Sequence, residues 1–361
     1  REEGASSHTV TIDAKDKDDK VEVTLKDVNI DASSRSEAAV SVTGKGDTTI
    51  ELDGDNELKS GAGHAGLEHN KTDTSGELTI QDKDNNGSLE AAGGFKGAGI
   101  GSAGSNDAQV KITGGNITAT SDDWGAGIGS GSSGTVEITG GEINATGGYL
   151  GAGIGGGCNG SGNVTISGGT ITAAGSDGAA GIGGGYYNGA TVTITGDAVI
   201  KNASSTKYGA GIGGGNGSDG NVTISGNAKI ENATGGYGAA GIGGGAFSSP
   251  DKIGNGNVVI KDNAKIDNVQ GGAYGAGIGG GIYGLSNVTI EGNTKVNATG
   301  GAGGAAIGGG AGAENNSDNN GNQITIKSNE NGSPTINAVG GGTDEGEKIV
   351  IGGAGIGAGC E

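Results

Sequence analysis

A short glycine-rich phrase recurs along most of the chain at nearly constant spacing. It reads Gly-Ala-Gly-Ile-Gly or a close variant, and successive copies are 26 to 36 residues apart. A second phrase falls between the copies, as in Val-Thr-Ile-Ser-Gly-Gly-Thr-Ile-Thr-Ala at residues 164–173. Such a period indicates a solenoid, in which each repeat forms one coil and packs against its neighbours. The isoleucines of the first phrase are Ile100, Ile128, Ile154, Ile182, Ile212, Ile242, Ile278 and Ile307.

Each repeat contains three short runs that alternate as a β-strand does. The runs are Val-x-Ile, x-Ile-x-Ala and Ala-Gly-Ile-Gly, and no segment has helical periodicity long enough for a helix. Three strands in about 28 residues fit one coil of a parallel β-helix, whose equivalent strands pair about 4.8 Å apart. The sequence therefore predicts an all-β fold, a right-handed parallel β-helix (solenoid) with three short strands per coil and about ten coils.

Glycine supplies 88 of the 361 residues, a content that would indicate disorder in a chain without repeats. Only four of these glycines precede residue 61. Residues 1–60 instead alternate polar and β-branched residues, as in Val21–Leu25. We expect one continuous domain, in which residues 1–60 form an irregular N-terminal β segment that caps the solenoid and residues 61–361 form the glycine-rich β-helix.

The same alternation predicts the core. In the phrase that contains Val164 and Ile166, these two side chains point inward and Thr165 points outward, and Ala152 and Ile154 point inward in the glycine-rich phrase. The glycines beside each such isoleucine then point outward and leave a face of bare backbone. That face is either open to a partner or a consequence of corners that require glycine.

The chain is strongly acidic, with a formal net charge of −20 and arginine only at positions 1 and 35. A chain with no basic stripe is a poor partner for nucleic acid or an anionic membrane surface. It contains no run of about 18 apolar residues, so we expect no membrane insertion. The acidity is consistent with solubility and with attraction of cations, and the sequence alone does not separate these two readings.

The two repeated phrases resemble the glycine-rich right-handed parallel β-helix repeats of Gram-positive bacterial cell-surface proteins, which are adhesin-like. The resemblance covers roughly residues 75–310. It implies an extracellular protein, secreted or attached to the cell wall. We therefore expect a non-enzymatic binding module that engages glycans, or a host or bacterial surface protein, through one face. A purely structural stalk is the alternative.

An enzyme is the alternative from another class, because parallel β-helices also host polysaccharide-degrading enzymes. Such enzymes require a base or paired carboxylates at the scissile bond. The coils after residue 60 contain no arginine, and the three histidines, His8, His64 and His69, all lie near the N-terminus. The acidic pair Asp122 and Asp123 is expected in a solvated turn. We expect no enzymatic activity and no required cofactor.

A calcium site is possible at Asp82-Lys-Asp-Asn-Asn-Gly87. Oxygen-bearing residues at its first, third and fifth positions, Asp82, Asp84 and Asn86, followed by glycine match the first half of a calcium-binding loop. Gly93 stands where that loop has its bidentate glutamate. A polar turn between two strands is the competing interpretation.

Aromatic residues form the most informative pattern for binding. The chain has ten, and six of them precede the isoleucine of a glycine-rich phrase by four or five residues. Stacked coils would align these six along one edge, where sugar rings could stack on them. The competing interpretation is that they plug the corner between two strands. The six are Phe95, Trp124, Tyr149, Tyr208, Tyr237 and Tyr274.

Two further expectations concern threonine and cysteine. Outward threonines, including Thr165, Thr193 and Thr223, predict a threonine column, which raises ice binding as a remote alternative. Cys158 and Cys360 lie six repeats apart, which places them roughly 29 Å apart at about 4.8 Å per coil. A disulfide needs Cα atoms within about 7 Å. We therefore expect no bond between them.

Overall fold

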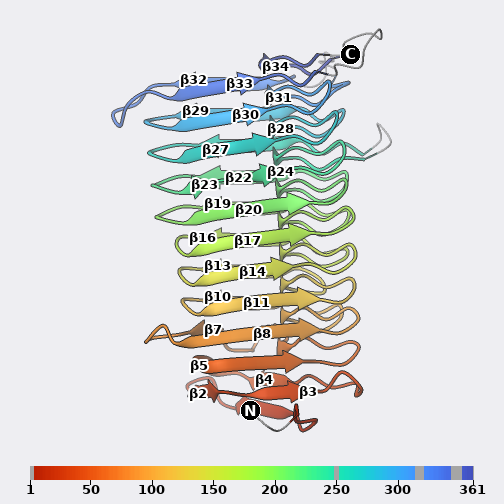
Figure 1. Cartoon of the computed structure of the whole chain (residues 1–361), viewed down its shortest axis with the longest axis vertical. Helices are drawn as coiled ribbons and strands as arrows, with labels where there is room; N and C mark the ends of the chain where they lie inside the picture. Colours follow the sequence, from red (N-terminus) through yellow and green to blue (C-terminus); the bar gives the residue numbers. More distant parts are fainter. Residues whose placement is uncertain (1–3, 248–251, 314–320, 343–351, 361) are drawn as a thin grey trace.

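The computed structural model describes residues 4–247, 252–313, 321–342 and 352–360. All regular elements in these ranges are β-strands, and every pairing between strands is parallel. The strands stack into a rod with the N-terminus at one end and the C-terminus at the other (Figure 1). The predicted all-β parallel solenoid of about ten turns is confirmed. Within the described ranges, the chain has no helix long and apolar enough to cross a membrane.

Each coil contributes in turn to three stacks of paired strands, which we call sheets I, II and III. Sheets I and II are continuous in the second coil. There the long strand β5 (Asp47–Lys59) bends at Gly54 and belongs to both sheets. Besides β5, sheet I contains β2 (Lys20–Lys26), β7 (Leu78–Gln81), β10 (Ala108–Ile112), β13 (Gly134–Ile138), β16 (Gly162–Ile166), β19 (Ala190–Ile194), β22 (Gly220–Ile224), β26 (Gly256–Ile260), β29 (Ser286–Glu291) and β32 (Gln323–Lys327).

Sheet II follows sheet I in every coil, and its register shifts in two places, after Ile171 and after Ile266. It contains β5 together with β3 (Asn29–Asp31), β8 (Gly87–Gly93), β11 (Asn116–Ser121), β14 (Glu142–Thr146), β17 (Thr170–Gly175), β20 (Val199–Ser205), β23 (Lys229–Ile230), β24 (Ala233–Thr234), β27 (Lys265–Gln270), β30 (Lys295–Thr299) and β33 (Thr335–Val339).

The strands of sheet III shorten along the rod, from five residues in β1 and β4 to two residues from β9 onward. It contains β1 (Val10–Ala14), β4 (Val40–Gly44), β6 (Leu67–His69), β9 (Ile100–Gly101), β12 (Ile128–Gly129), β15 (Ile154–Gly155), β18 (Ile182–Gly183), β21 (Ile212–Gly213), β25 (Ile242–Gly243), β28 (Ile278–Gly279), β31 (Ile307–Gly308) and β34 (Ile356–Gly357).

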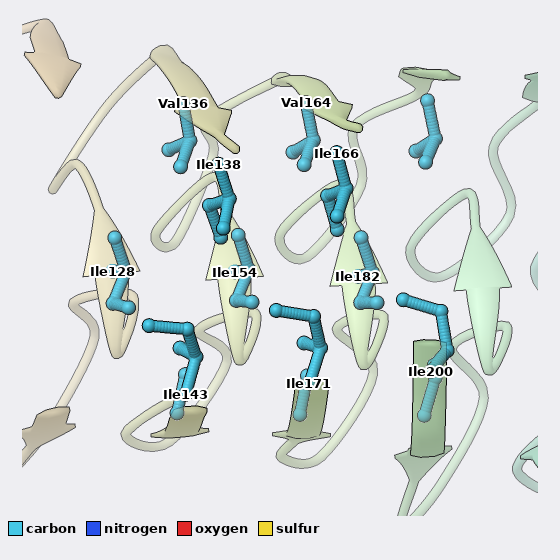
Figure 2. Close-up of a cluster of buried hydrophobic side chains, with 14 of the residues drawn as sticks. Ile128, Val136, Ile138, Ile143, Ile154, Val164, Ile166, Ile171, Ile182 and Ile200 are labelled. Atoms are coloured by element: carbon cyan, nitrogen blue, oxygen red, sulfur yellow. The ribbon is translucent and has the colours of Figure 1, made fainter. Parts of the chain in front are cut away.

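Aliphatic columns fill the interior as the alternation predicts. Ile128, Ile154 and Ile182 stack from coil to coil in sheet III, and the valines and isoleucines of sheets I and II face them (Figure 2). These side chains are fully buried, and each contributes about 1.5–3 kcal/mol relative to an exposed position. Because a single coil cannot close this core, its stability depends on the neighbouring coils.

The glycines beside the isoleucines of β9 to β31 are buried and form no face of bare backbone. The glycines flanking Ile182 are buried, because the backbone of adjacent coils lies directly against them. A Cβ on Gly183 would lie 2.1 Å from the carbonyl oxygen of Gly213. Its φ of +138° is also open only to glycine in practice. The corner therefore requires these glycines, and they leave no open backbone surface for a partner.

Candidate functional site

Two tight turns flank the short sheet III strand of each glycine-rich coil. The first turn follows sheet II, as at residues 148–151, where the N–H of Gly151 donates to the carbonyl of Gly148 (2.8 Å). The second leads to sheet I, as at residues 157–160, where Gly160 donates to Gly157 (2.8 Å). Between them Ala152 donates to the carbonyl of Gly156 (2.9 Å), which folds the segment back on itself.

The two turns therefore stack as two neighbouring ladders along the rod. They are joined across coils, because the second turn of one coil donates to the first turn of the coil before it. The N–H of Cys158 donates to the carbonyl of Trp124 (2.7 Å), and that of Ala246 donates to the carbonyl of Tyr208 (2.7 Å). These ladders form the double loops beside the ends of the sheet II strands in Figure 1.

All ten aromatic residues lie in these two ladders, which we call the aromatic edge, and none lies in the core. The six predicted residues occupy the second or third position of first turns. Tyr149 and Tyr237 are about half exposed, at 49% and 54%. The other four belong to the second turns. They follow the isoleucine of the glycine-rich phrase, whereas the first six precede it by four or five residues. These four are Tyr186, Tyr187, Phe247 and Tyr283.

The predicted column is built from separate groups of rings. Phe95 contacts Trp124, with ring centroids 5.6 Å apart. Tyr237 contacts both Tyr208 (6.1 Å) and Tyr274 (5.6 Å) in edge-to-face geometry. Both arrangements fall in the range of favourable aromatic pairs. The coil between Tyr149 and Tyr208 carries Asp177 and Gly178 at the first turn, so the column is interrupted there.

The second turns contribute another group of aromatic rings, which lies beside the coil that lacks a ring at its first turn. The hydroxyl of Tyr186 donates to that of Tyr187 (2.8 Å), and Tyr187 contacts Phe247 (5.6 Å). Burial and the Tyr187 hydroxyl raise the pKa of Tyr186. A Cβ at Gly178 would lie 2.6 Å from the ring of Tyr186, so the tyrosine covers the gap in the column.

Half of the aromatic residues have a backbone conformation that side chains of their size rarely adopt. Five have φ between +61° and +73°, at the turn position where glycine is normally required. Glycine fills the equivalent position in other coils of the same chain, at Gly178 and Gly238. Left-handed positions held by bulky residues concentrate at functional sites. The five are Trp124, Tyr187, Tyr208, Tyr274 and Tyr283.

Lysines accompany three of the ring groups. The Nζ of Lys96 lies 4.6 Å from the centroid of Trp124, that of Lys207 lies 5.0 Å from Tyr208, and that of Lys252 lies 4.0 Å from Tyr187. Such cation–π contacts contribute about 0.5–1 kcal/mol at exposed sites. Lys207 also pairs with Asp177 (3.4 Å), so the edge is not a simple basic patch.

A shallow groove of about 510 Å³ lies between the first turns and the ends of the sheet II strands β5, β8 and β11. Phe95 stands at its side, and small residues such as Ala92 and Thr120 line it, with Lys59 and Asp122 as its charged residues. Pockets for small ligands range from about 300 to 1,000 Å³. The groove thus joins an aromatic ring to polar groups in a volume suited to a short oligosaccharide.

The proposed calcium loop gathers carboxylates from two coils. Asp82 and Asp84 come together with Glu51, and the ligand oxygens of the three lie within 4.8 Å of one another. Asp82 already accepts the N–H of Asn86 (3.2 Å) and of Gly87 (3.0 Å), and the amide of Asn86 donates to Asp84 (3.0 Å). Sequence reasoning missed Glu51 because it belongs to the preceding coil.

The other candidate groups are dispersed. Asp122 borders the groove, while a carboxylate oxygen of the adjacent Asp123 is buried. His64 Nδ1 lies 2.8 Å from the buried carboxylate of Glu68, a contact that sequence spacing does not reveal. Both Cys158 and Cys360 are free, which confirms the expectation that they are not bonded to each other.

The threonine column is aligned in register on the outer face of sheet I. Thr165, Thr193 and Thr223 pair in sequence, and Glu137 and Val259 interrupt the column on either side. This face lies outside the aromatic edge. It therefore provides a control surface for binding experiments.

Comparison with known proteins agrees with this architecture. The family model described as a beta helix repeat matches five stretches, residues 110–132, 136–158, 164–186, 222–246 and 288–311. Together with the stacked parallel coils, these matches support a β-helix repeat protein. A search of curated proteins and a search of solved structures each found no match.

Proposed function

We propose that this protein is a non-enzymatic carbohydrate-binding β-helix that engages glycans through the aromatic edge. One observation carries the proposal: all ten aromatic residues lie on that edge, and none contributes to the core. Large apolar rings are normally buried, so their confinement to surface turns has no explanation in core packing. Exposed rings beside polar groups suit the apolar faces of sugar rings.

The backbone strain supports the same proposal. Replacing glycine by a bulky residue at a left-handed turn position costs about 1–3 kcal/mol. The chain places aromatic rings in that conformation at five turns. In other coils the equivalent first-turn position is filled by glycine, at Gly178 and Gly238, or by Lys96 and Leu150. Packing of neighbouring rings offsets part of this cost. Ligand binding would account for the remainder, whereas a purely structural stalk would gain from glycine at every turn.

We further propose that the protein acts outside the cell, secreted or displayed on the cell wall. The resemblance to Gram-positive surface repeats motivates this location, and the net charge of −20 favours solubility of a long repetitive chain. Its partners on this proposal are glycans of a host or bacterial surface. A rigid rod would hold the binding edge away from its point of attachment.

A glycan array tests the proposal with two sets of variants. The double variant Tyr208→Ala, Tyr237→Ala removes adjacent rings, and we expect glycan binding to fall about tenfold or more, as loss of aromatic stacking in a binding site does. The control variant Thr193→Ala, Thr223→Ala changes the outer face of sheet I and should bind as the wild type does. Unchanged binding by the tyrosine variant would reject the aromatic edge.

One further variant separates loss of binding from loss of folding. Tyr208 has a φ of +62°, which glycine adopts more readily than alanine does. Tyr208→Gly should therefore fold at least as well as the wild type and still lose affinity. The same preparations should release no reducing ends from a panel of polysaccharides. Cleavage that disappears in Asp122→Asn, Asp123→Asn would establish the enzyme alternative.

A further inference from the structure

We infer that the ligand is an uncharged, linear polysaccharide that lies along the rod and spans several coils, rather than the end of a branched glycan. This inference rests on the proposed function and specifies its substrate class. It depends on a column of sheet II residues beside the first turns, which we call the strip. Each member pairs with the next in register: Ala92, Thr120, Thr146, Ala174, Ser204, Thr234, Gln270 and Thr299.

The strip is accessible and contains no charged residue. All of its members are exposed or half-buried, and all are alanine, serine, threonine or glutamine. In a chain with 41 acidic and 21 basic residues, eight consecutive coils without a charge at one outward position stand out. Lysines stack on sheet II further from the first turns, as Lys229, Lys265 and Lys295 do. The outward position next to the strip is uncharged as well in the coils of Thr118, Asn144 and Thr172. An uncharged strip with hydroxyl and amide groups suits a neutral polyol.

The aromatic rings of the first turns accompany the strip along the rod, both before and after its central residue Ala174. Phe95, Trp124 and Tyr149 precede Ala174 in the coil sequence, and Tyr208, Tyr237 and Tyr274 follow it. Each group covers three successive coils. The groove of about 510 Å³ lies at the N-terminal part of this path, where Ala92, Thr120 and Phe95 line it.

The repeat distance favours an extended chain. Each coil advances about 4.8 Å, so the six steps from Ala92 to Gln270 span about 29 Å. One coil therefore advances by about the length of one pyranose unit in an extended chain. Contacts in successive coils then repeat along the ligand, and affinity should increase with the number of sugar units because later contacts form within one complex. A net charge of −20 disfavours polyuronates on the same path.

Binding to size-graded oligosaccharides tests the inference. Isothermal titration would use the whole chain with linear β-glucan, xylan, mannan and chitin oligosaccharides of two to eight units, and with oligogalacturonates of the same lengths. We expect at least one neutral series to gain about tenfold or more in affinity between two and six units. No gain beyond two units in any series, or tighter binding of oligogalacturonates, would overturn the inference.

A single substitution at the centre of the path provides a sharper test. Ala174→Glu places a bulky charge between the two aromatic groups, so octasaccharide affinity should fall about tenfold or more towards that of the trisaccharide, and trisaccharide affinity should stay unchanged. Thr172→Glu is the control, since Thr172 lies on the same strand and face but outside the strip. Equal effects of the two substitutions would overturn the inference. Melting temperatures of both variants establish that they are folded.

The outcomes separate this inference from the proposed function. If branched terminal glycans bind and Tyr208→Ala, Tyr237→Ala abolishes that binding, while no linear series shows a length dependence, the aromatic edge is a binding site and the extended path is wrong. If no glycan of any kind binds, both proposals fail.

Discussion

The N-terminal coils and the glycine-rich coils build the same solenoid with different corners. In the N-terminal coils, the sheet III strands β1 and β4 have five residues each, and Glu68 of β6 pairs with Gly101 of the next coil. From Gly101 onward, every such position is a glycine with φ between +129° and +143°. The β-helix itself therefore does not require glycine. The tight double turn does, and this turn carries the aromatic edge.

The difference between these regions connects the glycine content to function. All ten aromatic residues follow residue 94, in the region where the double turn is present. The N-terminal coils have longer sheet III strands and polar side chains at the corner, such as His64 and Glu68. Glycine is thus needed to shape the turns that hold the rings.

The largest expected effect is at the column of left-handed glycines. Gly183→Ala would place a Cβ 2.1 Å from the carbonyl oxygen of Gly213 and hold alanine at a φ of +138°. Strain and overpacking together should lower the free energy of unfolding by about 3–5 kcal/mol. The measurement is chemical denaturation followed by circular dichroism. Gly352→Ala is the matched control, because among the described residues no atom outside its chain neighbours lies within 4 Å of its Cβ position. Equal stabilities would contradict the role assigned to the column.

The second prediction concerns a buried histidine of the N-terminal coils. His69 is 2% exposed, and burial is the main cause that lowers its pKa, with the charge of Lys71 adding to the effect. Its ring nitrogens face the carbonyl oxygens of Val42 (3.3 Å) and Gly76 (3.0 Å). A lowered pKa means that the folded state prefers the neutral ring and the unfolded state takes up the proton first.

Stability should therefore fall as the pH drops below the unfolded pKa of about 6.5, by at most about 1.4 kcal/mol per pH unit until the folded pKa is reached. Thermal denaturation from pH 7.5 to 4.5 measures this slope. His69→Gln should reduce the slope between pH 6.5 and 5, whereas His8→Gln, at an exposed position, should not. A slope that is the same in both variants would show that other groups control the acid sensitivity.

Much of the fold followed from the sequence because burial imposes a period of two on a strand. That period identified the columns of Ile154 and Ile182, and the constant spacing of aromatics before the isoleucine identified one turn ladder. Sequence spacing could not show which neighbour faces a glycine, so it left open whether the glycines beside Ile182 form an open face or a required corner. The backbone contacts of Gly183 decide for the corner. Glu51 was missed because contacts between coils join residues about 30 positions apart.

The smallest expected effect is calcium binding in the N-terminal coils. Glu51, Asp82 and Asp84 bring oxygens within 4.8 Å of one another, and Asp82 is buried. Such a site would resemble weak extracellular calcium sites, with dissociation constants of about 10⁻⁴–10⁻³ M. At about 2 mM calcium and a dissociation constant of about 1 mM, linkage predicts about 0.6 kcal/mol of stabilisation.

The measurement is the melting temperature with and without calcium, with magnesium as the ionic control. Glu51→Gln, which leaves the backbone contacts of Asp82 intact, should abolish the calcium-specific increase. An equal increase in that variant would rule out this carboxylate cluster as the site and leave the loop as a polar turn.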